Sequence, residues 1–371
     1  MPIKSPIISY DEFKIVHLSD FHFTGRPVSD LSSKFWKHFN LDDLSESNLR
    51  CLLEDVISMD PDHIVITGDI TNTAHAAEFE KAKVWLLQLQ QQWRPDLAPI
   101  GTTDLRWELF TIVPGNHDVS RRQSLFGRRK AINSRLRTFM DTFGSTFGIQ
   151  PQNIYDFNEV FPHHKLLFDV IDLYATNSTL DVPVHVVGLN AVGKIGNTQR
   201  NRLAQLIESQ PMRNRFRVLA CHHHPLTIPY KPKPDIVEEF LIMRDARSFI
   251  RVCFEHRIDI MLHGHKHLPF IWKSQIIPEL DPPHSITVVS AGSPTHVRSG
   301  SSQVYNKYLV IRKTEGNTRS VQEVTMHSRR YDPKEEQFVP CGDEVKLYLS
   351  PQQQPSKDVP PRGEDGDFSQ R

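Results

Sequence analysis

Residues 258–267 read IDIMLHGHKH, an apolar run that ends in a glycine and two further histidines. The run predicts a β-strand buried on both faces, because a strand with one face in water alternates apolar and polar residues. Gly264, His265 and His267 come directly after the run. Binding sites of open α/β sheets assemble at the carboxyl ends of the strands. This stretch therefore predicts an α/β fold with a polar site at one sheet edge.

Four further motifs repeat this arrangement of an apolar run followed by polar residues. They are Asp20-Phe21-His22 after KIVHLS, Gly68-Asp69 after HIVIT, Gly115-Asn116-His117-Asp118 after FTIVP, and His222-His223-His224-Pro225 after RVLAC. Each motif alone is weak evidence of a site. All five motifs occur in order, each after a predicted strand, and together they indicate one composite site.

The whole sequence alternates short apolar runs with longer amphipathic segments, which is typical of α/β folds. The predicted strands are Phe13–Leu18, His63–Thr67, Leu109–Val113, Leu166–Tyr174, His185–Leu189, Phe216–Ala220, Ile258–Leu262, Ile286–Ser290 and Tyr308–Arg312. The predicted helices are Ser45–Ser58, Ala77–Gln91, Thr198–Ser209 and Val237–His256.

The composition narrows the class of protein. Apolar residues make up 38% of the 371 residues, which is enough for a hydrophobic core. No apolar run reaches the length of about 18 residues that predicts a transmembrane helix. The 44 basic and 44 acidic side chains cancel, which argues against a nucleic-acid coat or a membrane-surface binder. The four cysteines form no CxxC pair and no signal peptide is recognisable, so we expect a cytoplasmic protein.

The side chains of the five motifs suit metal ions. They offer carboxylate, imidazole and amide ligands but no thiolate, a set that fits divalent Mn, Fe, Zn, Ni or Co. The spacing of Asp20 and His22, like that of His265 and His267, lets both members of a pair face one ion. A carboxylate such as Asp69 can bridge two ions, and two ions can clamp a phosphate and activate a water for in-line attack.

The motifs resemble those of the calcineurin-like metallophosphoesterase superfamily, whose pattern is DxH, GD, GNH(D/E), H and GHxH. The resemblance covers about residues 13–300. Within the superfamily the chain is most similar to the class III cyclic nucleotide phosphodiesterase-like branch, on the segments GDITNTAHAAEFEKA, GNHD and HHHPL. The resemblance implies an α/β, four-layer sandwich in which two mixed β-sheets pack together and helices flank them.

The resemblance also implies roles for individual residues. Asp20, His22 and His267 would hold the first metal ion, Asn116, His222 and His265 would hold the second, Asp69 would bridge the two, and His117 would be the catalytic histidine. The fourth motif is ambiguous by one residue. The family pattern favours His222 as the ligand, with His223 as the alternative that would otherwise line the substrate pocket.

Three neighbouring polar residues have less specific interpretations. His296 follows another predicted strand end, where it is either a substrate contact or a solvated loop histidine. His263 is expected to stay within its strand and to point away from Gly264. Asp118 is expected to anchor local hydrogen bonds instead of binding a metal.

Two insertions interrupt the pattern, at residues 23–45 and 119–165. Within the second, residues 121–137 carry seven basic side chains and no acidic one. One interpretation is an amphipathic helix with a solvated basic face. The other is a cap in which Arg128, Arg129 and Lys130 hold an anionic substrate near the metals.

We therefore expect a metallophosphoesterase domain over residues 1–330, an extra strand or the start of a tail over 331–349, and a disordered tail over 350–371. The expected function is hydrolysis of a nucleotide or similar small phosphodiester by a dinuclear, metal-dependent phosphodiesterase. The alternatives are a DNA or RNA nuclease of the same superfamily and a non-catalytic metal-binding scaffold. No membrane partner is expected.

Overall fold

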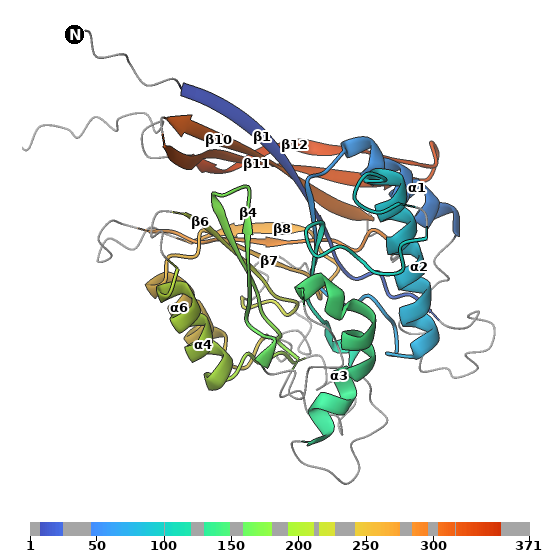
Figure 1. The fold of residues 1–371 in the computed structure, drawn as a ribbon, viewed down its shortest axis with the longest axis horizontal. Coiled ribbons are helices and arrows are strands. Elements are labelled where there is room, and N and C mark those ends of the chain that lie inside the picture. The colour runs from blue at the N-terminus through green and yellow to red at the C-terminus, as the bar shows by residue number, and fades with distance from the viewer. Residues whose placement is uncertain are drawn as a thin grey trace, which may run out of the picture.

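The computed structural model describes residues 8–24, 46–99, 101–119, 130–148, 159–179, 192–210, 215–226, 242–274, 284–295, 303–315 and 317–349. For residues 46, 47 and 130–135 it describes the backbone alone. Two six-stranded mixed sheets stack on one another in this part of the chain (Figure 1).

The first sheet has the order β12-β11-β10-β1-β2-β3. Its strands are β1 (Ile8–Leu18), β2 (His63–Ile66), β3 (Phe110–Ile112), β10 (Val304–Glu315), β11 (Thr318–Asp332) and β12 (Gln337–Leu349). β1, β2 and β3 run parallel, and β10 joins β1 from the other side in antiparallel register. The carboxyl ends of three consecutive parallel strands therefore meet at one edge.

The second sheet has the order β4-β5-β6-β7-β9-β8. Its strands are β4 (His163–Leu167), β5 (Ile171–Ala175), β6 (Phe216–Ala220), β7 (Ile260–His263), β8 (Phe270–Lys273) and β9 (Thr287–Ser290). The four inner strands are parallel, and β4 and β8 close the two sides as antiparallel strands. This sheet contributes its own row of carboxyl strand ends.

Helices cover the outer faces of both sheets. They are α1 (Glu46–Met59), α2 (Ala76–Trp93) and α3 (Lys130–Phe143) beside the first sheet, and α4 (Asn197–Glu208) and α6 (Ala246–Glu255) against the second (Figure 1). None of the helices in the described ranges is long and apolar enough to span a membrane. This arrangement confirms the predicted sandwich of two mixed sheets flanked by helices.

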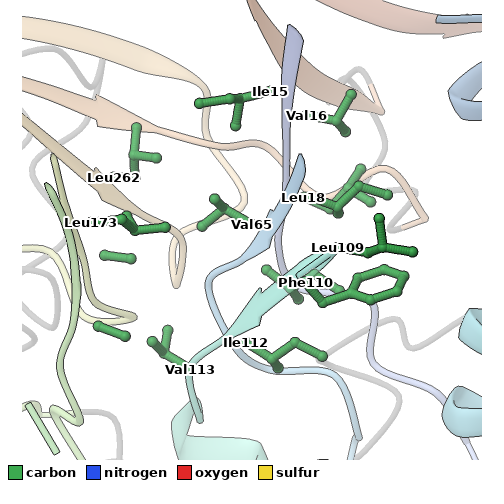
Figure 2. Packing of buried hydrophobic residues seen from close by; sticks show 14 of the residues in the cluster. Ile15, Val16, Leu18, Val65, Leu109, Phe110, Ile112, Val113, Leu173 and Leu262 are labelled. Carbon is green, nitrogen blue, oxygen red and sulfur yellow. The ribbon is translucent and has the colours of Figure 1, made fainter. Parts of the chain in front are cut away.

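The main hydrophobic core lies between the two sheets. Figure 2 shows Ile15 and Val65 of the first sheet near Leu173 and Leu262 of the second, and all four side chains are buried. This explains why the strands read as continuous apolar runs, since each is covered by the facing sheet on one side and by helices on the other.

The sequence prediction of one strand over Leu166–Tyr174 is wrong. The chain turns at Phe168 and Asp169, whose φ angles are 53° and 60°, and returns as the antiparallel pair β4 and β5. Asp169 is a residue type that turns favour, but the stretch holds no glycine or proline, and its neighbours Phe168 and Val170 are apolar.

Other differences concern element limits. In the described residues, the helix expected over Val237–His256 begins at Ala246. It follows Asp245, whose carboxylate accepts hydrogen bonds from the backbone N–H of Ile195 and Gly196. β8 and β11 were not expected, because β11 carries too many polar residues for an apolar run and β8 is only four residues long. Residues 331–349 contain β12, which pairs with β11. The expected strand His185–Leu189 and the tail over 350–371 lie outside the described residues.

Candidate metal centre

The five polar motifs meet at the carboxyl ends of β1, β2, β3, β6 and β7. The loops after the strands are tied together by backbone bonds, such as the Asp20 N–H donating to the Gly68 carbonyl at 2.9 Å and the His22 N–H donating to the Asp69 carbonyl at 3.0 Å. Five of the loop residues have left-handed backbone conformations, with φ between 50° and 81°; they are Asp20, His22, Asp69, His265 and His267. Such conformations are costly away from glycine, and they cluster at functional sites.

Two glycines let the loops approach closely. Gly68 has a φ of +89°, and a Cβ there would lie 2.6 Å from the backbone nitrogen of Gly115. A Cβ at Gly264 would lie 1.8 Å from Ser19 Oγ and 2.4 Å from Asp20 Oδ2. These two motif glycines therefore bring the strand ends close enough for their side chains to share one site.

The first group of converging side chains is Asp20, His22 and His267, one atom of each lying within 4.8 Å of the others. His267 Nε2 lies 2.9 Å from His22 Nε2 and 3.4 Å from Asp20 Oδ1. His22 Nε2 also lies 3.9 Å from Asp69 Oδ2. Two imidazoles and two carboxylates thus point at one another from β1, β2 and β7.

The second group is built from Asn116, His222, His265 and the same Asp69. His222 Nε2 lies 3.2 Å from both Asn116 Oδ1 and His265 Nδ1. It lies 3.3 Å from Asp69 Oδ2. Because Asp69 Oδ2 faces both groups, it is the atom through which the two clusters join.

Surrounding hydrogen bonds fix these side chains in place. The His222 Nδ1–H donates to the Thr67 carbonyl at 2.7 Å, which leaves Nε2 with the lone pair that a metal needs. Asp69 Oδ1 accepts the His117 backbone N–H at 2.8 Å, which leaves Oδ2 for the cluster. The Ser293 hydroxyl donates to the Asp20 carbonyl at 2.7 Å and so supports the first loop.

Asp118 lies behind the cluster and organises the backbone. Its carboxylate accepts the N–H groups of Ile70, Thr71 and Gly115 at 3.2, 2.8 and 2.9 Å. These bonds tie the β2 loop to the β3 loop. Asp118 therefore anchors local structure, as its sequence context indicates.

His117 lies on the rim of the first cluster. Its Nδ1 lies 2.6 Å from the carbonyl oxygen of Asn72, and its ring centre lies 4.8 Å from that of His22. Because a carbonyl only accepts, Nδ1 keeps its proton and Nε2 is the nitrogen that can exchange one. One atom each of His22, Asp69 and His117 lies within 4.8 Å of the others.

The buried groups of the two clusters shift one another's pKa values. Burial by itself raises the pKa of Asp69, but the imidazoles of His222 and His117 hold that pKa well below its usual range. Burial opposes the charge on His222 too, yet the Asp69 carboxylate raises the pKa of the imidazole to about 9. Burial and the neighbouring imidazoles of His223 and His222 lower the pKa of His265 well below its usual value.

The residues present fit two divalent cations. The donor set is carboxylate, imidazole and one amide, which suits first-row metals. The donor atoms are buried and already close together, so little reorganisation is needed on binding. A cation would replace the proton shared by the Asp69 and His222 side chains, because a ligating imidazole must be neutral. Asp20, His22 and His267 would hold one ion, Asn116, His222 and His265 the other, and Asp69 both.

The other candidate residues are placed differently. His263 lies in β7, is buried, and its Nδ1 lies 3.0 Å from the Gly264 carbonyl oxygen. Arg128, Arg129 and His296 lie outside the described residues, and of Lys130 only the backbone at the start of α3 is described.

Several supporting residues were not singled out from the sequence. They are Asn72, Ser178, Ser293 and Thr295. Ser293 and Thr295 lie after the end of β9, in a segment that the strand-end pattern does mark. Asn72 and Ser178 act through a backbone carbonyl and a hydroxyl, for which the sequence carries no signal.

The family model for calcineurin-like phosphoesterases matches residues 13–269. The chain belongs to the calcineurin-like phosphoesterase family. Family membership and the two ligand clusters support a metal-dependent phosphoester hydrolase with a dinuclear centre. No curated protein sequence matches this calcineurin-like phosphoesterase.

Two phosphatases are among the solved structures that share its fold. A dimetal phosphatase from Danio rerio is 11% identical with a TM-score of 0.50, and the match covers 91% of this chain and 99% of that one. The purple acid phosphatase PPD1 from yellow lupin (Lupinus luteus) seeds is also 11% identical with a TM-score of 0.50. That match covers 91% of this chain and 53% of the lupin chain. At this identity the similarity establishes the fold alone.

Proposed function

We propose that this calcineurin-like phosphoesterase is a dinuclear phosphodiesterase that hydrolyses a nucleotide or a similar small phosphodiester. The observation that carries the proposal is the position of Asp69 Oδ2, which lies 3.9 Å from His22 Nε2 and 3.3 Å from His222 Nε2. A carboxylate oxygen between two ligand clusters suits a bridged pair of cations. When bound, the two cations supply the positive charge that neutralises phosphoryl oxygens and activates water.

His117 is the proposed general acid. The carbonyl of Asn72 holds Nδ1 in its protonated form, so protonation of the ring places the second proton on Nε2. A proton on Nε2 can pass to the leaving oxygen as the bond to phosphorus breaks. The ring lies beside His22 at the rim, where a substrate can approach.

A small diester is favoured over other substrates by the sequence. The phosphoprotein phosphatase branch of the superfamily has the motifs GDxVDRG and GNHE. This chain has GDITNT and GNHD at the corresponding positions and lacks the arginine of the first motif. The net charge of zero gives little support to nuclease activity on long nucleic acids. The two fold relatives are named phosphatases, which makes phosphomonoester hydrolysis the main alternative outcome.

The basic insertion is proposed to select the substrate. In α3 the side chains of Leu136, Phe139, Met140 and Phe143 are buried, as expected for an amphipathic helix. If Arg128, Arg129 and Lys130 bind substrate, replacing all three by Glu raises KM for nucleotides more than for a small aryl diester. Equal effects on both substrates would contradict the cap interpretation. The insertion would then be an amphipathic helix with a solvated basic face.

The direct experiment compares bis(p-nitrophenyl) phosphate with p-nitrophenyl phosphate, with Mn²⁺ or with EDTA, on the wild type and Asp69→Asn. Diester cleavage that EDTA and Asp69→Asn both abolish supports the proposal. Preference for the monoester moves the substrate class to phosphomonoesters. Protein that binds no metal and cleaves neither ester points to a non-catalytic scaffold that holds no metal.

The setting proposed for this activity is the cytoplasm. All four cysteines, Cys51, Cys221, Cys253 and Cys341, are free thiols, which suits a reducing compartment.

A further inference from the structure

His223 is a buried imidazole beside the metal centre that the two ligand sets do not use. Its side chain is fully buried, and its Nε2 has no hydrogen-bond partner among the described residues. A buried polar nitrogen without a hydrogen-bond partner is destabilising, so such atoms are rare unless a bound ligand supplies the missing hydrogen bond. One ring nitrogen each of His222, His223 and His265 lies within 4.8 Å of the others. His223 therefore lies at the second cluster.

The ring of His223 is held in one orientation from three sides. Its Nδ1 lies 2.7 Å from Ser178 Oγ. A Cβ at Gly193 would lie 2.3 Å from His223 Cγ, so the glycine backbone packs directly on the ring. The His265 ring lies on another side, with the ring centres 4.6 Å apart. Because Ser178 and Gly193 lie between β5 and α4 in the chain while His223 follows β6, the orientation is a product of the tertiary fold.

The hydrogen bonds of Ser178 favour the tautomer of His223 in which Nε2 carries the proton. Ser178 Oγ accepts the backbone N–H of His223 at 3.2 Å. Among the described residues, the acceptor within reach of the Ser178 hydroxyl proton is His223 Nδ1. With Nδ1 accepting, the neutral imidazole carries its proton on Nε2. A protonated Nε2 cannot bind a metal ion, but it can donate to an anion.

We propose that the Nε2–H of His223 donates a hydrogen bond to a non-bridging phosphoryl oxygen of the substrate, on the side of the second cation. The inference rests on the proposed phosphoesterase function and adds a substrate-binding residue to it. A neutral donor suits this position, because it contributes to anion binding without adding a positive charge that would repel the two cations. Ser178 and Gly193 serve as positioning residues that keep the donor aimed at the oxygen.

The test uses the full chain loaded with Mn²⁺ and three variants. His223→Phe keeps a ring of similar size without the donor, and His223→Gln keeps an N–H donor. Ser178→Ala removes the group that fixes the tautomer. Metal content per chain is measured by mass spectrometry, the affinity for inorganic phosphate by calorimetry, and folding by the thermal unfolding midpoint.

His223→Phe is expected to weaken phosphate binding about 10- to 100-fold, the range for a lost hydrogen bond to a charged group, with the metal content unchanged. His223→Gln should retain affinity within about threefold, and Ser178→Ala should fall between the two variants. Should His223→Phe fail to fold, Ser178→Ala carries the test alone, and unchanged affinity there overturns the inference.

Two results overturn the donor role. Loss of about one metal ion per chain from His223→Phe would make His223 a metal ligand. Unchanged phosphate affinity in His223→Phe would make it a packing residue. Phosphate calorimetry does not depend on turnover, so it separates this inference from the proposed function: a wild type that binds phosphate through His223 but cleaves no phosphodiester contradicts only the latter.

Discussion

Gly115→Ala tests whether the close approach of the β2 and β3 loops builds the metal centre. Gly115 has a φ of −101°, so an alanine can adopt its backbone conformation without strain. The substitution therefore acts through contact alone. An added Cβ would lie 2.2 Å from both the backbone nitrogen and Oδ1 of Asp69.

The size of the effect follows from these distances. Ordinary contact begins at 3.4 Å, so the two loops must separate by about 1.2 Å, the difference between 3.4 and 2.2 Å. The backbone nitrogen of Asp69 cannot rotate away as a side-chain end can. Asp69 Oδ2, which is proposed to bridge the two cations, moves with it, and a shift of about 1 Å at a reacting centre costs about 100-fold in rate. Overpacking of this kind destabilises the fold by about 1–3 kcal/mol.

The assay combines metal content, thermal unfolding and diester hydrolysis on Gly115→Ala and a control. Gly101→Ala is the control, because no atom lies within 4 Å of its added Cβ while its φ of +96° still imposes a backbone cost. We expect both variants to lose stability, but only Gly115→Ala to lose bound metal and most of its activity. A Gly115→Ala protein that keeps two metal ions and activity within about threefold would refute the reasoning.

Three further outcomes are expected. His117→Ala should lower kcat about 100- to 1000-fold while the metal content stays at the wild-type value, because His117 is proposed to move a proton and not to hold a cation; loss of both metals would show that role to be wrong. EDTA should lower the unfolding midpoint of the wild type, because a cation present at about 1,000 times its dissociation constant stabilises the fold by about 4 kcal/mol per site. An unchanged midpoint would mean that the clusters hold no metal. Burial lowers the pKa of Lys165 from 10.5 to about 7, so above pH 7 the unfolded chain binds the extra proton. The stability of the wild type relative to Lys165→Met should therefore rise by about 2 kcal/mol between pH 7 and 9, and a flat difference measured by chemical denaturation would exclude a buried neutral amine.

Much of this architecture could be predicted from the sequence because burial on both faces leaves a clear pattern. Runs such as HIVI in β2 and FRVLA in β6 are mostly apolar, so strand and strand end can both be located. Polar residues directly after several such runs must gather at a sheet edge. The types of side chain in those motifs, carboxylate, imidazole and amide, are by themselves enough to indicate metal chemistry.

Other features depended on contacts that the pattern does not encode. The reversal places Phe168 and Asp169 in left-handed backbone, which aspartate tolerates but phenylalanine does not favour, and the pairing of β4 with β5 holds the turn. β11 forms because it pairs with both β10 and β12, and its buried residues do not form one apolar run. In such strands the backbone partner, and not a local apolar run, stabilises the element.

The sequence alone determined which residue types form the site. The tertiary structure decided how the consecutive histidines His222 and His223 differ in orientation and contacts. His222 and His223 are identical in type and adjacent in the chain, so their pattern allows either to face the metals. In the fold, the Thr67 carbonyl holds His222 with Nε2 toward Asp69, while Ser178 and Gly193 hold His223 beside it. The physical reason is that a ring nitrogen's role depends on what the other ring nitrogen touches, and those contacts come from loops far away in the sequence.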